Sequence, residues 1–308
     1  MPLGTDNFEY LERRHGMDHD RYSWSMLHER PPVSWPGDRP VALWVNVVVE
    51  SFPLDDDGQP FKLPGALRKP YPDVQTFTWR DYGNRVGIYR LMRAFDTYGI
   101  QPTWAVNGAI PGLYPGLMRD LCARGDEIIA HGWDMATPHY GGMDESEEKA
   151  IIARTLDALN AAAPSKIRGW LSPGKSQSER TPELIAQAGL DYMCDWPNDD
   201  MPYEFRTDEG PLIAMPHSDD IDDQRIIGDY KHGEPSFVEE VCDHCSWHAK
   251  EAASSGSARI LALNLHPWMI GQSHRISYLE ELLAILQERC VSMSATQICD
   301  SWTSQQPQ

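Results

Sequence analysis

The chain has 308 residues and a formal net charge of −19, with 41% hydrophobic and 24% charged residues. This composition is ordinary for a globular protein, and the length suits one large α/β domain or two small ones. The acidic balance argues against nucleic acid and anionic membranes as partners, because both bind basic surfaces. The sequence has no apolar run of membrane-spanning length and no secretory signal at its N-terminus, so we expect a cytoplasmic protein.

The chain begins with an irregular segment and continues as a regular alternation. Prolines, charges and aromatics without a regular hydrophobic period predict an irregular arm over residues 1–40. The β-branched run from Val41 to Val49 predicts a central parallel strand that is buried on both faces. Further strands are predicted over residues 103–106, 127–130, 167–171, 190–194, 211–215, 259–265 and 291–293. Helices are predicted over residues 85–98, 114–123, 144–159, 181–188, 237–253 and 276–287, with a short helix at the end.

This alternation predicts one domain over residues 41–303 and a short tail over residues 304–308. About eight strands that alternate with helices favour a (β/α) barrel, with an open doubly wound sheet as the alternative. No Gly-x-Gly-x-x-Gly turn follows an early strand, which disfavours dinucleotide binding. The six cysteines are scattered along the chain, as is typical of reduced thiols. Cys242-x-x-Cys245 lies in a helical segment without a second ligand pair, so we predict no zinc site there.

The first seven predicted strands share one feature, which is a polar residue directly after or near the end of each. These residues are Glu50, Asn107, His131, Ser172, Asp195, His217 and His266. In a barrel, the carboxyl ends of parallel strands meet at one rim, where active sites form. We therefore predict an active site on this rim, with acid–base chemistry as the available reaction type.

Three of these rim residues are candidates for proton transfer. Burial beside the apolar strand is expected to raise the pKa of Glu50 toward the range of a general base. His131 and His266 could exchange protons near neutral pH or bind a metal. No Gly-x-Ser-x-Gly turn is present, so a serine nucleophile is not supported.

Five segments of the chain resemble the polysaccharide deacetylase (NodB-homology) superfamily, and within it the allantoinase-like branch. They are residues 81–87 (DYGNRVG), 127–133 (EIIAHGW), 169–174 (GWLSPG), 195–203 (DWPNDDMPY) and 265–271 (LHPWMIG), the last followed by Arg275. The resemblance covers about residues 40–303. It implies a distorted (β/α) barrel of the polysaccharide deacetylase type and a homo-oligomer, often a tetramer. It also implies hydrolysis of a carbon–nitrogen bond, either in a small amide or in the N-acetyl group of a sugar.

The metal-binding pattern of this superfamily is altered in the chain. Metal-dependent members carry two aspartates after the first strand, where this chain has only Glu50. Their two histidines after the third strand correspond to His131 and Met135, and a thioether is a poor zinc ligand. The arginine expected after the fourth strand is replaced by Leu171-Ser172. We therefore predict hydrolysis without a bound metal. If zinc does bind, its expected ligands are Glu50, His131 and His139, with His217 or His266 as replacements for His139.

These observations predict a hydrolase that cleaves a non-peptide carbon–nitrogen bond in a small amide, ureide or cyclic imide. Glu50 and His131 are expected to activate water, with either one as the base, and His266 to protonate the leaving nitrogen. Loops 51–80 and 196–235 are expected to shape the pocket, and Asp222 and Asp223 to orient a histidine. The residues expected to contact substrate are Trp79, Asn107, Trp133, Trp170, Ser172, Asp199, Asp200, Tyr203, His217 and Arg275.

Two other functions stay open on the sequence. The first is a metal-dependent N-deacetylase of an amino sugar or peptidoglycan, against which the altered ligands, the negative charge and the missing signal count. The second is a catalytically inactive relative that binds a ligand, against which the retained Glu50, His131 and His266 count.

Overall fold

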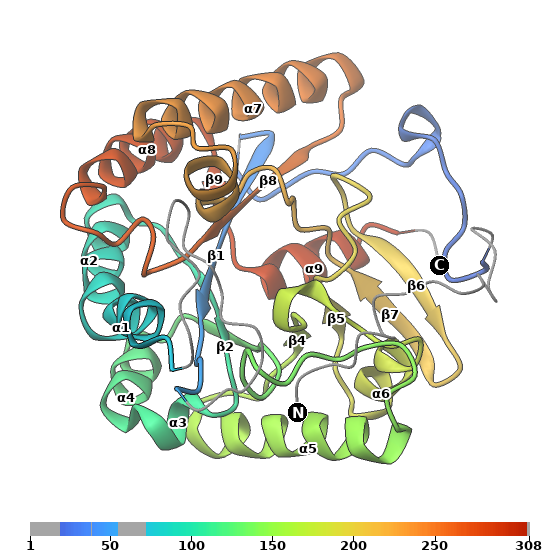
Figure 1. Ribbon diagram of the computed structural model, residues 1–308. Helices are drawn as coiled ribbons and strands as arrows, with labels where there is room; N and C mark the ends of the chain where they lie inside the picture. Colours follow the sequence, from blue (N-terminus) through green and yellow to red (C-terminus); the bar gives the residue numbers. More distant parts are fainter. Residues whose placement is uncertain (1–18, 38, 55–71, 307–308) are drawn as a thin grey trace.

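The computed structural model describes residues 19–37, 39–54 and 72–306. Its centre is a nine-stranded sheet in the order β6-β7-β5-β4-β3-β2-β1-β8, with β9 also paired to β1. The sheet curls inside a ring of helices (Figure 1). The strands are β1 Val41–Val49, β2 Thr103–Val106, β3 Glu127–Ala130, β4 Gly169–Trp170, β5 Tyr192–Met193, β6 Tyr203–Thr207, β7 Gly210–Ala214, β8 Arg259–Leu265 and β9 Val291–Ser292. This curled half-barrel in a single α/β domain confirms the predicted fold class.

The barrel does not close by strand pairing in the part of the chain described. The pair β6–β7 is antiparallel, whereas the other pairs of the sheet are parallel. Beyond β8, the next contact is an isolated bridge between Asp222 and Asn264. This bridge matters for the site, because it brings the segment around Asp222 and Asp223 to the carboxyl end of β8.

The helices are α1 Val74–Tyr82, α2 Ile88–Tyr98, α3 Ile110–Leu113, α4 Pro115–Arg124, α5 Glu145–Ala162, α6 Thr181–Gln187, α7 Glu234–Ser255, α8 Ile276–Arg289 and α9 Ala295–Thr303. A π-helical turn, Gly83–Gly87, joins α1 to α2. The unpredicted helix α1 begins at Val74, where Asp73 caps the backbone of Thr76. The helix predicted over residues 85–98 is α2, which begins at Ile88. It ends at Gly99 with φ of 63°, as a glycine cap predicts.

Four predicted strands have the bounds that the sequence indicated: 41–49, 103–106, 127–130 and 259–265. The strands predicted over residues 167–171 and 190–194 shorten to two residues each, β4 and β5. The strand β6 was not predicted, and its antiparallel pairing with β7 interrupts the expected β/α alternation.

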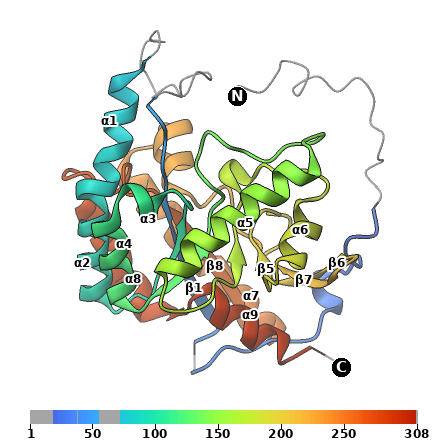
Figure 2. The same ribbon diagram turned by 90° about the horizontal axis from the view of Figure 1, so that it is seen from below.

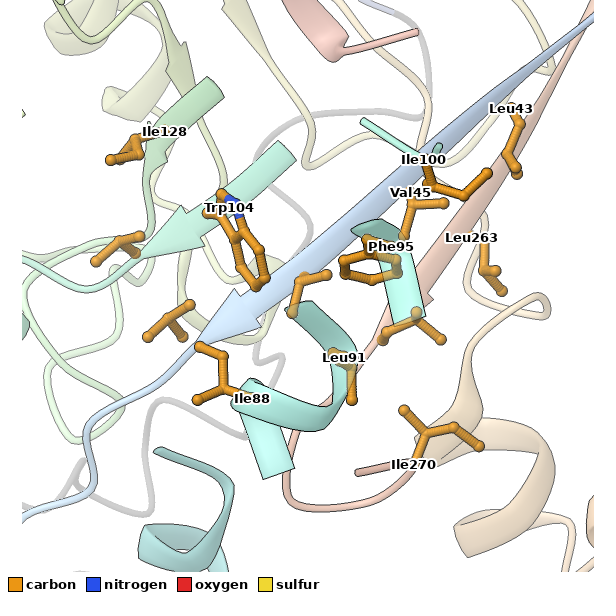
Figure 3. Close-up of a cluster of buried hydrophobic side chains, with 14 of the residues drawn as sticks. Leu43, Val45, Ile88, Leu91, Phe95, Ile100, Trp104, Ile128, Leu263 and Ile270 are labelled. Atoms are coloured by element: carbon orange, nitrogen blue, oxygen red, sulfur yellow. The ribbon is translucent and has the colours of Figure 1, made fainter. Parts of the chain in front are cut away.

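The core lies on both faces of β1, each of whose residues is buried. On the outer face, Leu43 and Val45 pack with Leu91 and Phe95 of α2, together with Trp104 (Figure 3). On the inner face, Ala42, Trp44 and Val48 belong to a second apolar cluster. A strand that is covered twice is rigid, so β1 holds the residue that follows it, Glu50, in a fixed place.

Residues 19–37 run along the outside of the domain near β6 (Figure 2). The backbone N–H of Arg206 in β6 donates to the carbonyl of Arg21 at 2.6 Å. Trp35 is buried, and its indole N–H donates to the carbonyl of Arg259 at 2.8 Å. Residues 1–18 of the predicted arm and residues 307–308 of the predicted tail lie outside the described residues. Among the described helices, none is both long and apolar enough to cross a membrane.

Candidate active site

A cavity of about 360 Å³ opens at the carboxyl ends of β1, β3, β4 and β8. The strand-end residues Glu50, His131, Ser172, His217 and His266 line it. Its other lining residues are Val48, Phe52, Arg80, Met135, Leu171, Gly174, Lys175, Asp219, Asp222, Gln224, Arg225, Asp229, Asn264 and Trp268. The structure thus brings together the three residues predicted to be catalytic, although the outer two, Glu50 and His266, are 216 positions apart in the sequence.

Glu50 is a buried carboxylate held by neighbours from three other parts of the chain. The indole N–H of Trp268 donates to Glu50 Oε2 at 2.8 Å, and Glu50 Oε1 lies 4.0 Å from His131 Nε2. Burial acts to raise the pKa of Glu50, but His131, His266 and Arg80 outweigh it and lower that pKa to about 2. The expectation of a raised pKa is therefore wrong, and Glu50 is an anion at neutral pH.

His131 is oriented by a backbone carbonyl. Its Nδ1 lies 2.9 Å from the carbonyl oxygen of Leu171, and because a carbonyl only accepts, Nδ1 carries the proton. The other nitrogen, Nε2, then presents its lone pair toward Glu50 when the ring is neutral. Gly132 allows the turn that follows, with φ of 60° and with Pro173 Cγ 2.4 Å from where a Cβ would stand.

His266 is an imidazolium in an acidic setting. Its Nδ1 lies 2.7 Å from Asp223 Oδ1 and 3.8 Å from Asp222 Oδ1. Burial opposes the charge, but Asp222, Asp223 and Glu50 together raise the pKa of His266 to about 10. The backbone N–H of His266 also donates to Asp223, so ring and backbone are fixed together. The expectation that Asp222 and Asp223 orient a histidine is confirmed for Asp223, whereas Asp222 accepts hydrogen bonds from Asn264 and from the backbone N–H of Arg225.

Ser172 and His217 also line the cavity, but only His217 has hydrogen-bonding groups that are not already paired within the described residues. Ser172 donates from Oγ to Asp195 Oδ2 at 2.7 Å, so its hydroxyl is committed to that carboxylate. His217 is fully buried, packs edge-on against Trp44 at 5.1 Å, and has no hydrogen-bond partner on either ring nitrogen within the described residues. Burial and the charges of Lys175 and the other histidines lower the pKa of His217 well below 6.5. It is therefore a neutral ring that can donate and accept one hydrogen bond each to a bound molecule.

Asn107 does not reach the cavity as an oxyanion donor. Its side-chain oxygen accepts from the backbone N–H of Ser51 at 2.7 Å, and its amide nitrogen donates to the carbonyl of His131. It therefore ties the loop after β1 to the loop after β3. That role positions Glu50 and His131 rather than substrate.

The three tryptophans predicted to wall the pocket stand outside it. Trp79 packs on the cavity residue Trp268, with ring centroids 4.7 Å apart. Trp133 lies under the guanidinium of Arg154 at 3.4 Å. Trp170 is fully buried and donates from its indole N–H to Ser172 Oγ at 2.8 Å.

Four polar residues predicted to contact substrate are also outside the cavity lining, because each is drawn to another part of the fold. Asp199 pairs with Arg30 of the N-terminal segment at 2.7 Å. Tyr203 donates to Asn198 at 2.7 Å. Arg275 pairs with Glu234 at 2.8 Å, so its guanidinium is not available for a substrate carboxylate. Asp200 lies beside His248 and Glu251, a cluster separate from the cavity.

Sequence reasoning missed several cavity residues. Arg80 comes from α1, which was not predicted, and its guanidinium stacks on Phe52 at 3.5 Å. Trp268 lies in the segment 265–271, in which the sequence predicts a role only for His266. Lys175, with φ of 53°, donates to the carbonyl of His217 at 2.7 Å and pairs with Asp219. Of the loops expected to shape the pocket, residues 217–229 do so, whereas residues 55–71 lie outside the described residues.

A family model described as polysaccharide deacetylase matches residues 73–193. This match covers 121 of the 308 residues. A peptidoglycan deacetylase of Helicobacter pylori (strain ATCC 700392 / 26695) is 25% identical over 111 residues, which are 36% of this chain and 37% of that protein. The match thus spans little more than a third of that relative.

Two solved structures share the polysaccharide deacetylase fold over nearly the whole chain. Puue allantoinase has a TM-score of 0.80 and 22% identity, over 91% of this chain and 96% of that one. A probable polysaccharide deacetylase from Pseudomonas aeruginosa PAO1 has a TM-score of 0.81 and 23% identity, with the same coverage. At these identities the likeness shows the fold alone.

Polysaccharide deacetylases usually use a metal ion, but the predicted ligands Glu50, His131 and His139 do not form a three-ligand site. The three potential ligands that the structure brings together at the cavity are Asp222, Asp223 and His266, and there the imidazole and Asp223 already bind each other. Glu50 Oε1 and His131 Nε2 are 4.0 Å apart and could share an ion, yet the third position is Met135. Within the described residues, neither triplet of potential ligand atoms closer than 4.8 Å includes Glu50 or His131. The alternative ligand His139 is not part of the cavity lining, and its Nδ1 is 2.9 Å from Glu148 Oε1. The set Glu50, His131 and His139 is therefore not assembled.

Proposed function

We propose that this polysaccharide deacetylase homologue hydrolyses a carbon–nitrogen bond in a small amide, ureide or cyclic imide, without the metal triad of the family. The observation that carries the proposal is the convergence of a carboxylate, an imidazole lone pair and an imidazolium on one cavity. Glu50, His131 and His266 are these groups. A cavity of about 360 Å³ suits a compact substrate better than a polymer chain.

In the proposed reaction, water binds between Glu50 Oε1 and His131 Nε2. An oxygen about 2.8 Å from both atoms is compatible with their separation of 4.0 Å. His131 takes the proton as the water attacks the carbonyl carbon, since a carboxylate with a pKa of about 2 is the weaker base. Glu50 accepts the second water hydrogen and stabilises the imidazolium that forms on His131.

His266 donates a proton in the proposed reaction, whereas His131 accepts one. As an imidazolium whose Nδ1 is bound to Asp223, it has Nε2–H left for a bound molecule. This proton stabilises the negative charge of the tetrahedral intermediate and then passes to the leaving nitrogen, which departs poorly as an anion.

The charges around the cavity favour an uncharged substrate. Four carboxylates line it and are balanced by four cations: Glu50, Asp219, Asp222 and Asp229 against Arg80, Lys175, Arg225 and His266. Lys175 pairs with Asp219, and Arg225 with Asp229. Since each charge has an opposite neighbour, the remaining recognition falls to His217, which offers one donor and one acceptor to the N–H and C=O groups of a ureide or imide.

A substrate screen before and after chelation tests the proposal. Allantoin, hydantoins, succinimide-like imides and N-acetyl sugars are offered to chelator-treated enzyme, and ammonia, ring opening or acetate is measured. We expect turnover of a ureide or imide that survives chelation. Turnover of N-acetyl sugars alone, or loss of activity restored by zinc, would instead favour a metal-dependent N-deacetylase, the activity named for the Helicobacter relative.

The three proposed groups are tested by substitution. His131→Gln and His266→Gln should each lower kcat by about 10²-fold or more, and Glu50→Gln should do the same. His232→Gln is the matched control, because His232 is paired with Glu240 on the surface, away from the cavity. If the three variants turn over substrate as fast as the wild type does, these residues have no part in the reaction. If the wild type turns over none of the compounds in the screen, the ligand-binding alternative is favoured instead.

We further propose a cytoplasmic homo-oligomer, a tetramer in the simplest case, with no nucleic-acid or membrane partner. Trp24 is 85% exposed, and Met26 and Leu27 beside it are also exposed, which supports a surface covered by a second copy. Light scattering of the full chain measures the state, and replacing Trp24 with Ser should shift it toward monomer.

A further inference from the structure

A second group of metal-ligating side chains lies outside the cavity, where α7 meets the connection from β5 to β6. Asp200, His248 and Glu251 each present one ligand atom there, and these atoms all lie within 4.8 Å of one another. His248 and Glu251 are three residues apart on α7, so they share one face of the helix. Asp200 reaches them from another part of the chain, which makes the group a tertiary arrangement and not a local run of charge.

One ring nitrogen of the histidine in this group has no hydrogen-bond partner among the described residues. His248 is only 3% exposed, and its Nδ1 is buried without a hydrogen bond to any described residue. Buried polar atoms are almost always paired, so an unpaired nitrogen on an imidazole that is grouped with two carboxylates indicates a missing ligand. Water or a cation could supply the contact, and the two carboxylates favour a cation.

A fourth donor stands one helical turn away. His244 precedes His248 by four residues, and the two imidazole rings lie 4.2 Å apart. Histidines at this spacing lie on the same face of a helix and can bind one ion together. Glu251 also contacts Arg259, at 3.4 Å, which fixes the carboxylate without occupying both of its oxygens.

We propose that Asp200, His248 and Glu251, with His244 as the fourth donor, bind a divalent transition metal of the Zn²⁺ type. Imidazole nitrogens and carboxylate oxygens are ligands that zinc accepts in tetrahedral sites. The bound ion would fasten the β5–β6 connection to α7. The neighbouring thiols do not belong to the site, because Cys245 is buried with its Sγ 3.4 Å from Cys290 Sγ.

Isothermal titration calorimetry of the chelator-treated full chain with Zn²⁺ alone tests this site. We expect one equivalent of zinc to bind. We expect Asp200→Asn to raise the dissociation constant for zinc at least about tenfold. Asp200 is exposed, so this variant should fold normally. Asp243→Asn is the matched control, because Asp243 is an exposed acid of the same helix outside the group, and it should bind zinc as the wild type does.

A further variant tests whether zinc binds in the cavity instead of at the proposed group. Glu50→Gln should keep the zinc equivalent, whereas loss of binding in Glu50→Gln with retention in Asp200→Asn would overturn the proposal and place the ion in the cavity. Absence of binding by the wild type would also overturn it.

X-ray absorption of the zinc-loaded protein identifies the ligand atoms directly. We expect a shell of nitrogen and oxygen at about 2.0–2.2 Å, with no sulfur at about 2.3 Å. Sulfur in that shell would assign the metal to Cys242 or Cys245 and contradict the proposed group.

Discussion

Trp268, Arg80 and His266 reach the carboxylate of Glu50 from elements far apart in the sequence. Burial alone would raise the pKa of this carboxyl, yet its neighbours lower it to about 2. The site therefore holds opposite charges on buried side chains, where electrostatic interactions are strong. In the proposed reaction, proton transfer then falls to the histidines, which differ in what their Nδ1 atoms contact. His131 faces a carbonyl, and His266 faces a carboxylate.

Asp223→Asn should separate these two roles through pH. His266 keeps its proton up to a pH of about 10 because Asp222, Asp223 and Glu50 stabilise the imidazolium. As an acid, it loses activity only when pH rises past that value. Removing the Asp223 charge lowers the pKa of His266, so the alkaline limit of kcat/KM should move to lower pH. An unchanged alkaline limit in the variant would argue against His266 as the acid.

The same ionisation predicts how stability changes with pH. The folded-state pKa of His266 lies above its ordinary value of 6.5, so its contribution to stability is complete below pH 6.5 and is lost as pH rises toward about 10. Urea unfolding of wild type should therefore show a fall over this window that His266→Gln reduces. A fall of equal size in both proteins would contradict the ion pair with Asp223.

Trp268→Phe isolates a single hydrogen bond. Its indole N–H donates to Glu50 Oε2 at 2.8 Å, and phenylalanine keeps an aromatic ring while removing that donor. We expect kcat to fall about tenfold, which corresponds to about 1.4 kcal/mol for a hydrogen bond to a charged group. Trp247→Phe is the control, because Trp247 is 61% exposed on α7. Equal rates for both variants would show that Glu50 does not depend on the indole.

At the scale of elements, the π-helical turn between α1 and α2 supports the loop that carries His266 and Trp268. A Cβ on Gly87 would stand 2.0 Å from the carbonyl oxygen of Pro267, and one on Gly83 would stand 2.7 Å from the backbone nitrogen of Trp268. Helix and loop are therefore in backbone contact, which only glycine permits. A rigid contact of this kind transmits the position of the helix to the site.

Gly87→Ala should disturb both stability and activity. The added methyl group must push the 266–268 loop away, and overpacking of this kind costs about 1–3 kcal/mol. We expect a lower unfolding midpoint in urea together with a reduced kcat. Gly112→Ala, at a helical position where an added Cβ meets nothing within 4 Å, should leave both unchanged. Normal activity in the Gly87 variant would show that the loop tolerates displacement.

The elements that the sequence predicted are those with a strong local pattern. The β-branched run of β1 and the apolar stripe of α2 are such patterns, whereas α1 buries only Thr76 and Arg80 and has no apolar stripe. The strand β6 alternates exposed and buried residues at the sheet edge and is fixed by pairing with β7, a tertiary contact. Prediction therefore succeeded where burial was continuous and failed where an element depends on a distant partner.

The same division holds for the candidate site. Glu50, His131, Ser172, His217 and His266 were predictable because parallel strands end on one rim. The contacts that surround them come from loops whose packing the sequence does not encode locally. Asp199, for example, is predicted to contact substrate, but it pairs with Arg30 of the N-terminal segment, a contact that the local sequence does not indicate.

For the whole molecule, the net charge of −19 contrasts with a cavity whose carboxylates and cations balance. A strongly acidic protein repels anions at long range, whereas an uncharged substrate feels no such force. The kcat/KM of a neutral imide or ureide should therefore change less than about twofold between about 50 mM and 500 mM salt, because screening has little to act on. An analogue bearing a carboxylate should instead react faster as salt rises, since screening weakens its repulsion. Stopped-assay rates for the matched pair measure both trends. A steep fall with salt for the neutral compound would mean that the enzyme attracts its substrate by charge, and the balance of the cavity would then not describe recognition.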